Sequence, residues 1–182
     1  MKHNLGILGP AGSGKGVAAK YIARKYGYNI ISMGNIVRAL ARTEHIKPTR
    51  ANLEKIGEKY SKVYGKDFVI EHAIEKAKAI NKPVILDGIR KPIQAQLAKQ
   101  RLGAVLILVD ATPEVRFERM KKRKRANFPK TLEIFKKEEK QEERFFNLKK
   151  TFSMADYILD NSELSERQLY SAMDKVVRRI NS

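Results

Sequence analysis

The sequence predicts an α/β fold in which helices cover both faces of a five-stranded parallel sheet. Five short apolar runs alternate along the chain with longer segments that have the spacing of helices. The runs are almost continuously apolar, which is typical of parallel strands buried on both faces. A glycine-rich turn joins the first run to the first helix, and the length of 182 residues is that of one domain.

The elements follow one another in a regular order. The predicted strands are Asn4–Leu8, Asn29–Ser32, Pro83–Gly88, Ala104–Asp110 and Asp156–Asn161. The predicted helices are Gly14–Lys25, Gly34–Arg42, Thr49–Gly65, Asp67–Ile80, two that begin near Pro92 and Thr112, a charged helix Phe135–Leu148, and Ser165–Ile180. Thr112 and Pro113 are a favoured cap and first-turn pair, and Asp67 is a candidate cap. Strands separated by helices favour parallel pairing, because parallel neighbours need a crossover.

The charge of the chain indicates its partners. Hydrophobic residues make up 42% of the sequence, enough for a core, and the formal net charge is +18. Such a surface attracts polyanions and phosphorylated ligands. Nucleic acid is the less favoured partner, because net charge alone indicates only non-specific affinity.

The composition also bears on the compartment. The chain contains no cysteine, which excludes disulfides and thiolate metal sites and fits a reducing compartment. The longest apolar run, Ala104–Val109, is far shorter than a membrane span, and no apolar signal segment precedes the first strand. We therefore expect a cytoplasmic protein with no membrane partner.

The segment GPAGSGKGV, Gly9–Val17, has the pattern of a phosphate-binding loop, or P-loop. It lies between a predicted strand and a predicted helix, where glycines let backbone N–H groups point at phosphates. Lys15 would reach the β- and γ-phosphates of a nucleoside triphosphate. The usual motif places Ser or Thr after the lysine, whereas Gly16 and Val17 follow here. The predicted nucleotide contacts are Gly9, Ala11, Gly12, Ser13, Gly14, Lys15, Gly16 and Val17.

Two further segments accompany the loop: ISMGNIVRAL, Ile31–Leu40, and VILDGIRKP, Val84–Pro92. With the loop they resemble the P-loop nucleoside monophosphate kinase family of the adenylate kinase type, with similarity to dephospho-coenzyme A kinases and archaeal nucleotide-kinase-like proteins. The resemblance covers nearly the whole chain. It implies one P-loop NTPase domain, 1–182, with a core of 1–32, 81–118 and 150–182. It also implies an acceptor-binding helical insert at about 33–80 and a short lid at about 119–149.

The resemblance implies a site for the acceptor's phosphate. Ser32, Gly34 and Arg38 match the family's element, with Asn35 in place of the usual aspartate. Arg38 would grip the phosphate, because a guanidinium binds it in a two-pronged way and keeps its charge. Taken alone, Arg38 would be one of many surface arginines on a basic protein. Arg90 would be a second clamp on the acceptor.

Asp87 is the candidate magnesium ligand. It ends a predicted strand, and carboxylates at the carboxyl ends of parallel strands face the ligand crevice. Magnesium keeps much of its hydration shell and often uses only one or two carboxylates. In this hypothesis the metal relies on Asp87, phosphate oxygens and water rather than on a loop hydroxyl. Asp110 also ends a strand and is the competing candidate.

The segment VRFERMKKRKR, Val115–Arg125, places Arg119 and Arg123 on one helix face, four residues apart. The resemblance implies that both contact ATP and the migrating phosphoryl group. For the lysines of the run Lys121–Arg125 we favour a solvated basic patch over a site role. In the next segment, Glu138 and Glu139 stand where the resemblance leads us to expect an Arg-Asp pair. Asn161, after the last strand, is the implied neighbour of the nucleotide base.

Together with the resemblance, these residues imply a kinase that uses ATP and Mg²⁺ to phosphorylate a nucleoside monophosphate, its small-molecule acceptor. The predicted catalytic set is Lys15, Asp87, Arg90, Arg119 and Arg123. One alternative is a kinase similar to dephospho-coenzyme A kinases, which would phosphorylate a hydroxyl group and need a base. Another alternative is a P-loop ATPase stimulated by nucleic acid. The sequence favours no particular base in the acceptor.

Overall fold

The computed structural model describes residues 2–65, 68–123 and 128–182. Its centre is a single parallel β-sheet. Within these residues the sheet has five strands in the order β2-β3-β1-β4-β5. The strands are β1 (Leu5–Leu8), β2 (Asn29–Ser32), β3 (Val84–Asp87), β4 (Val105–Asp110) and β5 (Tyr157–Asp160). Because β1 is the middle strand, the turn after it lies at the centre of the sheet's carboxyl edge. The predicted five-stranded parallel sheet is confirmed.

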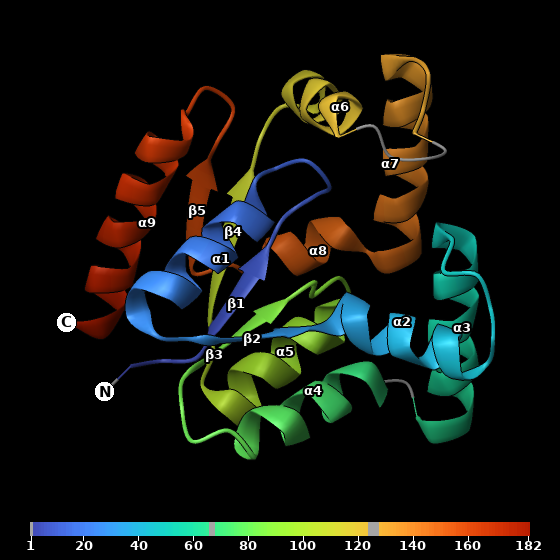
Figure 1. The fold of residues 1–182 in the computed structure, drawn as a ribbon, viewed down its shortest axis with the longest axis horizontal. Helices are drawn as coiled ribbons and strands as arrows, with labels where there is room; N and C mark the ends of the chain where they lie inside the picture. Colours follow the sequence, from blue (N-terminus) through green and yellow to red (C-terminus); the bar gives the residue numbers. More distant parts are fainter. Residues whose placement is uncertain (1, 66–67, 124–127) are drawn as a thin grey trace.

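Helices cover both faces of the sheet (Figure 1). They are α1 (Lys15–Tyr26), α2 (Met33–Thr43), α3 (Arg50–Tyr64), α4 (Phe68–Lys78), α5 (Pro92–Leu102), α6 (Pro113–Lys122), α7 (Leu132–Phe146), α8 (Leu148–Phe152) and α9 (Glu166–Asn181). α1 and α9 pack on one face, and α4, α5 and α8 pack on the other. None of the helices in the described ranges combines the length and the apolar character needed to cross a membrane.

Successive strand residues enter two separate hydrophobic clusters, one on each face of the sheet. Ile7 of β1 packs with α1 and α9, whereas its neighbour Leu8 packs with the helices of the opposite face. Leu106 and Ile107 of β4 divide in the same way. Since side chains alternate between the faces of a strand, burial of both faces requires a continuous apolar run. Each fully buried Leu or Ile contributes about 1.5–3 kcal/mol.

Two local features differ from the elements expected from the sequence. The predicted helix Phe135–Leu148 begins and ends earlier, as α7, because Thr131 caps it by accepting a hydrogen bond from the backbone N–H of Ile134. Asn147 then adopts a left-handed φ of 55°, and the chain turns directly into the short helix α8, which was not predicted. The candidate cap Asp67 lies outside the described residues.

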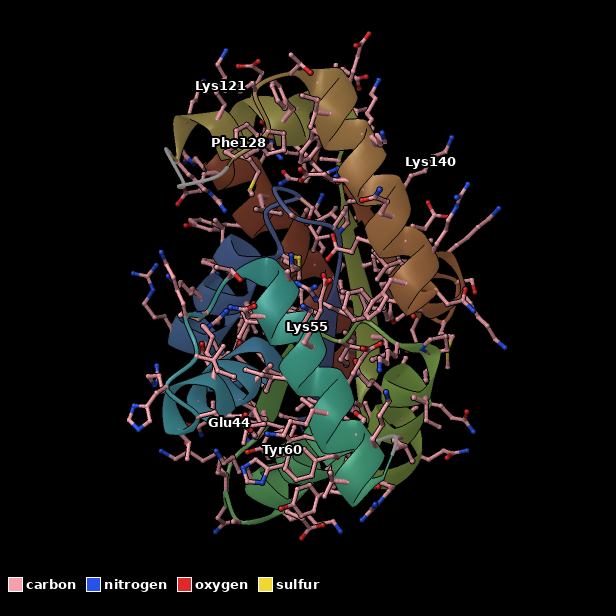
Figure 2. All side chains as sticks on the ribbon, turned by 90° about the vertical axis from the view of Figure 1, so that its right-hand side faces the viewer. Glu44, Lys55, Tyr60, Lys121, Phe128 and Lys140 are labelled. Carbon is pink, nitrogen blue, oxygen red and sulfur yellow. The ribbon has the colours of Figure 1, made fainter. Side chains whose placement is uncertain are left out.

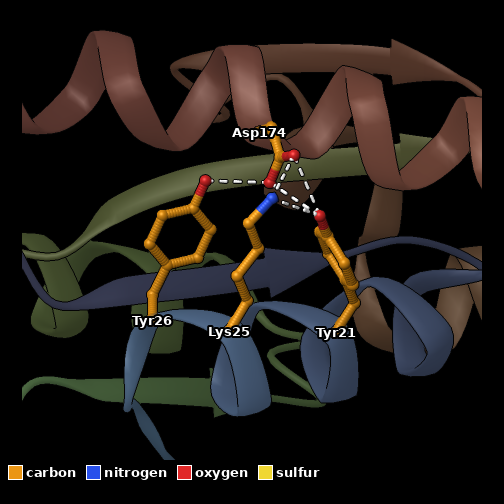
Figure 3. A network of polar contacts seen from close by, with 4 residues as sticks. All are labelled: Tyr21, Lys25, Tyr26 and Asp174. Carbon is orange, nitrogen blue, oxygen red and sulfur yellow. Dashed lines mark hydrogen bonds and ion pairs between the residues drawn. The ribbon is translucent and has the colours of Figure 1, made fainter.

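A polar network joins α1 to α9 (Figure 3). The carboxylate of Asp174 accepts hydrogen bonds from Nζ of Lys25 at 2.5 Å and from the hydroxyls of Tyr21 and Tyr26 at 2.8 Å each. Burial by itself would raise the pKa of Asp174, but these hydrogen bonds lower it below its usual value. The ring of Tyr21 also stacks on Tyr170 of α9, with centroids 4.1 Å apart. The helix that begins at the P-loop is thus fixed to the last helix of the chain.

Candidate active site

The loop between β1 and α1 changes direction at three glycines. Gly9, Gly12 and Gly14 have φ angles of 143°, 84° and 98°, which other residues adopt only with strain. Gly14 is the N-cap of α1, so the first turn of the helix lies at the end of the loop. In that turn the N–H groups of Val17 and Ala18 donate to the carbonyl oxygen of Gly14, and the N–H of Lys15 donates to Oγ of Ser13 at 3.4 Å. The N-terminus of this twelve-residue helix carries a partial positive charge that favours a bound anion.

Neighbouring elements hold the loop from outside. A Cβ added to Gly14 would lie 2.3 Å from Nδ2 of Asn161, and this nitrogen donates to the carbonyl oxygen of Ser13 at 2.8 Å. A Cβ added to Gly12 would lie 2.8 Å from the carbonyl oxygen of Arg116 in α6. Contacts with α6 and with the turn between β5 and α9 therefore determine the loop's shape. The other predicted nucleotide contacts, Ala11, Gly16 and Val17, lie in the turn before α1 and in its first turn.

Lys15 is the first residue of α1, and its Nζ donates to the carbonyl oxygen of Pro10 at 3.0 Å. Burial lowers the pKa of Lys15 to about 8. Four charged groups from other elements also act on this ammonium: Asp87, Arg90, Glu142 and Arg123. The two carboxylates raise the pKa and the two guanidinium groups lower it. The charges of three predicted site residues, and of one that was not predicted, therefore act on Lys15.

Two carboxylates end strands on either side of β1. Asp87 ends β3, where it pairs in register with Ser32 of β2 and acts on the nearby Lys15. Asp110 ends β4, accepts a hydrogen bond from the next backbone N–H at 2.8 Å, and acts on Arg116. Across the described residues, no three or more His, Cys, Asp or Glu are arranged to hold a metal ion. The carboxylate of Asp87 fits a magnesium ion that takes its other ligands from phosphates and water.

The first turn of α2 adjoins the turn that follows β3. Gly88 in that turn has a φ of 91°, and a Cβ added there would lie 3.7 Å from the backbone nitrogen of Gly34. Ser32 caps α2 by accepting a hydrogen bond from the backbone N–H of Asn35 at 3.4 Å. Arg38 donates to Oδ1 of Asn35 at 2.5 and 3.2 Å, and its guanidinium lies over Gly34. The predicted acceptor residues of this segment thus meet at one end of α2.

The two arginines predicted on one face of α6 have different surroundings. Arg119 donates to the carbonyl oxygen of Asn161 at 2.8 Å, and burial lowers its pKa. Among the described residues, Nη1 of Arg119 and Oδ1 of Asn161 are buried without a hydrogen-bond partner. Arg123 caps the carboxyl end of α6, and its charge acts on both Arg119 and Lys15. Arg119 therefore ties α6 to the turn after β5, whereas the charge of Arg123 acts on the ammonium of Lys15. Lys124 and Arg125 lie outside the described residues.

Known proteins resemble this chain in sequence. A family model described as AAA domain matches residues 8–136. The UPF0200 protein of Hyperthermus butylicus is 33% identical over 98% of this chain and 96% of its own length. A UPF0200 protein of Pyrococcus horikoshii is also 33% identical, over 97% of this chain and 96% of its own. The chain belongs to both families.

Solved structures share the fold of this AAA-domain chain. Shikimate kinase from Acinetobacter baumannii, solved in complex with shikimate, matches with a TM-score of 0.67 at 15% identity, over 98% of this chain and 94% of that one. Shikimate kinase from Bacteroides thetaiotaomicron matches with a TM-score of 0.68 at 16% identity, over 99% of both chains. At such identity the likeness is one of fold, and the fold is that of P-loop kinases, as the sequence predicted.

Three charged residues of the site were missed from the sequence. Arg116 is buried in α6, donates from Nε to the carbonyl oxygen of Ala111 at 2.7 Å, and pairs with Glu139 of α7. Glu142 of α7 pairs with Arg90, with Nη1 and Oε1 2.7 Å apart. A signal was present, because Glu139 and Glu142 are three residues apart and so share a helix face. The sequence shows that spacing but not which arginines lie opposite.

A cavity of about 680 Å³ opens beside the loop on the β4 side. Its walls include Pro10 of the loop, Asp110 of β4, Phe152 of α8 and one face of α7. This volume suits a small-molecule ligand. Figure 2 shows α7 above α3 on the same side of the molecule. Glu142, whose charge acts on Lys15, also lines this cavity.

Proposed function

We propose that this protein is a kinase that uses ATP and Mg²⁺ to move the γ-phosphoryl group of ATP onto the phosphate of a nucleoside monophosphate. The observation that carries the proposal is the glycine loop that runs into the N-terminus of α1, where the buried ammonium of Lys15 stands, and the charges of Asp87, Arg90 and Arg123 act on that ammonium. Such a set of fixed cations with one carboxylate suits phosphoryl transfer, in which the protein acts by positioning groups and neutralising charge. The shared fold with solved kinases supports the same class of reaction.

The donor side of the proposal rests on the loop and α1. The loop N–H groups and Lys15 would bind the triphosphate, and Asn161 would keep the loop in shape through Ser13. Arg123 would neutralise charge on the migrating group, and Arg119 would steady α6 beside it. Asp87 would hold magnesium, which when bound neutralises the β- and γ-phosphate oxygens. The ammonium of Lys15 would regain its proton fully beside a phosphate, because the anion outweighs the cost of burial.

The acceptor side rests on the residues at the start of α2. Ser32, Gly34 and Arg38 would receive the acceptor's phosphate, within the proposed insert of about 33–80, and Arg90 would hold it from the other side. To do so Arg38 must leave Asn35, a neutral partner that holds a guanidinium more weakly than a phosphate does. An acceptor phosphate oxygen is already anionic, so the reaction needs no general base. α7 belongs to the proposed lid of about 119–149, which would exclude water.

A screen of acceptors tests the proposal. ATP and magnesium are supplied with each nucleoside monophosphate, with dephospho-coenzyme A, or with single-stranded RNA, and ADP release is measured. We expect ADP to form with at least one nucleoside monophosphate, and Lys15→Met to abolish it. Transfer only to dephospho-coenzyme A would show a hydroxyl acceptor instead. ADP release that requires RNA and falls steeply with salt would show a nucleic-acid-stimulated ATPase and contradict the proposal.

A further inference from the structure

The face of α7 that meets the site carries a nearly symmetric set of residues. Phe135, Glu139, Glu142 and Phe146 follow one another at intervals of four, three and four residues. These spacings place all four side chains on one side of a helix. The segment therefore presents two carboxylates between two aromatic rings, and Glu139 is one of the two residues that stand where the resemblance led us to expect an Arg-Asp pair.

Each half of this set holds one arginine. Glu139 pairs with the guanidinium of Arg116, whose Cζ lies 5.7 Å from the ring centroid of Phe135. Glu142 pairs with the guanidinium of Arg90, whose Cζ lies 5.1 Å from the ring centroid of Phe146. A carboxylate at the edge and an aromatic ring near the guanidinium restrain both its position and its plane.

The two arginines differ in what they leave available. The side chain of Arg116 is only 8% exposed and also donates to the carbonyl oxygen of Ala111, so this half anchors α6 to α7. The side chain of Arg90 is 48% exposed, and its charge acts on Lys15. The carbonyl oxygen of Arg90 accepts a hydrogen bond from Oγ1 of Thr151 in α8 at 2.8 Å. The side chain of Arg90 is thus held by α7, and its backbone is held by α8.

We propose that Glu142 and Phe146 are positioning residues that hold the guanidinium of Arg90 ready for the acceptor's phosphate. This rests on the proposed function, in which Arg90 is a phosphate clamp. Among the described contacts, Glu142 engages Nη1 and no side chain bonds to the other nitrogens of the guanidinium. A long side chain that is held before binding loses less entropy when it grips a phosphate. α7 thus aids the reaction by orienting Arg90. When α7 packs in place, it also fixes the position of the Arg90 guanidinium.

The first test measures the order of Arg90 without any ligand. In protein labelled with ¹⁵N, the Nε–H signal of Arg90 is assigned with Arg90→Lys, and its heteronuclear NOE is measured. We expect Glu142→Ala and Phe146→Leu to lower this NOE. Glu138→Gln is the matched control. This substitution also removes one negative charge from α7, and Glu138 has no hydrogen bond or ion pair among the described contacts. An unchanged NOE in both test variants, with melting temperatures near the wild type's, would overturn the proposal.

The second test asks whether Glu142 acts through Arg90. Diadenosine pentaphosphate, a probe that spans donor and acceptor positions, is titrated into wild type, Arg90→Ala, Glu142→Ala and the double variant. We expect each single change to weaken binding roughly tenfold or more, and the double variant to bind as Arg90→Ala does. Fully multiplied effects would mean that Glu142 acts independently, against the proposal. A Lys15→Met variant that binds the probe normally would instead contradict the proposed function, and the NOE would still decide the role of Glu142.

Discussion

Replacing Lys15 with methionine is expected to stabilise the protein in the absence of nucleotide. Burial lowers the pKa of Lys15 from 10.5 to about 8, which corresponds to roughly 3 kcal/mol against the charged form at neutral pH. Lys15 is partly exposed, so water screens part of this cost. The variant also loses the hydrogen bond to Pro10, worth about 1 kcal/mol. We expect a net gain of about 1–2 kcal/mol in the free energy of unfolding, and a melting temperature several degrees higher.

The gain should depend on pH in a defined window. The pKa of Lys15 is near 10.5 in the unfolded chain and about 8 in the folded protein, so between these values the unfolded state binds more protons. The wild type therefore gains stability relative to the variant as the pH rises through this range. Below pH 8 the variant should show its full advantage, and near pH 10.5 the advantage should have disappeared.

Urea unfolding of both proteins at pH 7 and pH 10, with and without ATP and magnesium, measures these effects. Lys20→Met is the matched control, because Lys20 is an exposed lysine on the same helix. At a hundredfold excess of ATP over its dissociation constant, the wild type should gain about 2.7 kcal/mol and the Lys15 variant nothing. A Lys15 variant that is no more stable than the wild type at pH 7, or that keeps the same advantage at pH 10, would refute the reasoning.

Two further predictions concern the elements that hold the loop. Gly14→Ala should lower stability by about 1–3 kcal/mol, because the left-handed φ strains alanine and the new Cβ meets Asn161. Gly16→Ala, with no neighbour within 4 Å of its Cβ, should keep or slightly raise stability, and equal losses in urea unfolding would contradict this. Asp174→Asn should cost about 1 kcal/mol at pH 7. Because the pKa of Asp174 is lowered, its contribution is present above about pH 4 and is lost below, so the difference from wild type should shrink there. Tyr21→Phe, which removes one of three partners, is the control for melting curves taken across this range, and a deficit that is constant with pH would be evidence against the ion pair.

Much of the fold could be predicted because its signals are local. The apolar run of β4 and its neighbours follows from burial on both faces, and the helix starts follow from residues such as Pro92 and Pro113. The glycines of the P-loop indicate a turn whose backbone angles few other residues can adopt. Where prediction failed, as at α8, the deciding event was a single left-handed residue, Asn147, which the surrounding pattern does not reveal.

The partners of the site's side chains had no such local signal. Asn161 stays a predicted neighbour of the nucleotide base, and no local pattern indicated that its side chain bonds to Ser13, 148 residues away in the chain. Arg119 and Arg123 share the spacing of one helix face, yet Arg119 contacts the turn after β5, and the charge of Arg123 acts on Lys15. Spacing determines which residues share a face, and it does not determine what another element brings to that face.

The sequence by itself determined the parallel sheet, the phosphate-binding loop and the position of Asp87 at a strand's end, since each depends on residues close together in the chain. Only the tertiary structure decided that Arg90 is held by Glu142, 52 residues further on, and that the charge of Asp87 acts on Lys15 and that of Asp110 on Arg116. The physical reason is that the interaction between two charges depends on the distance between them in space. Those distances are set only when the helices pack on the sheet.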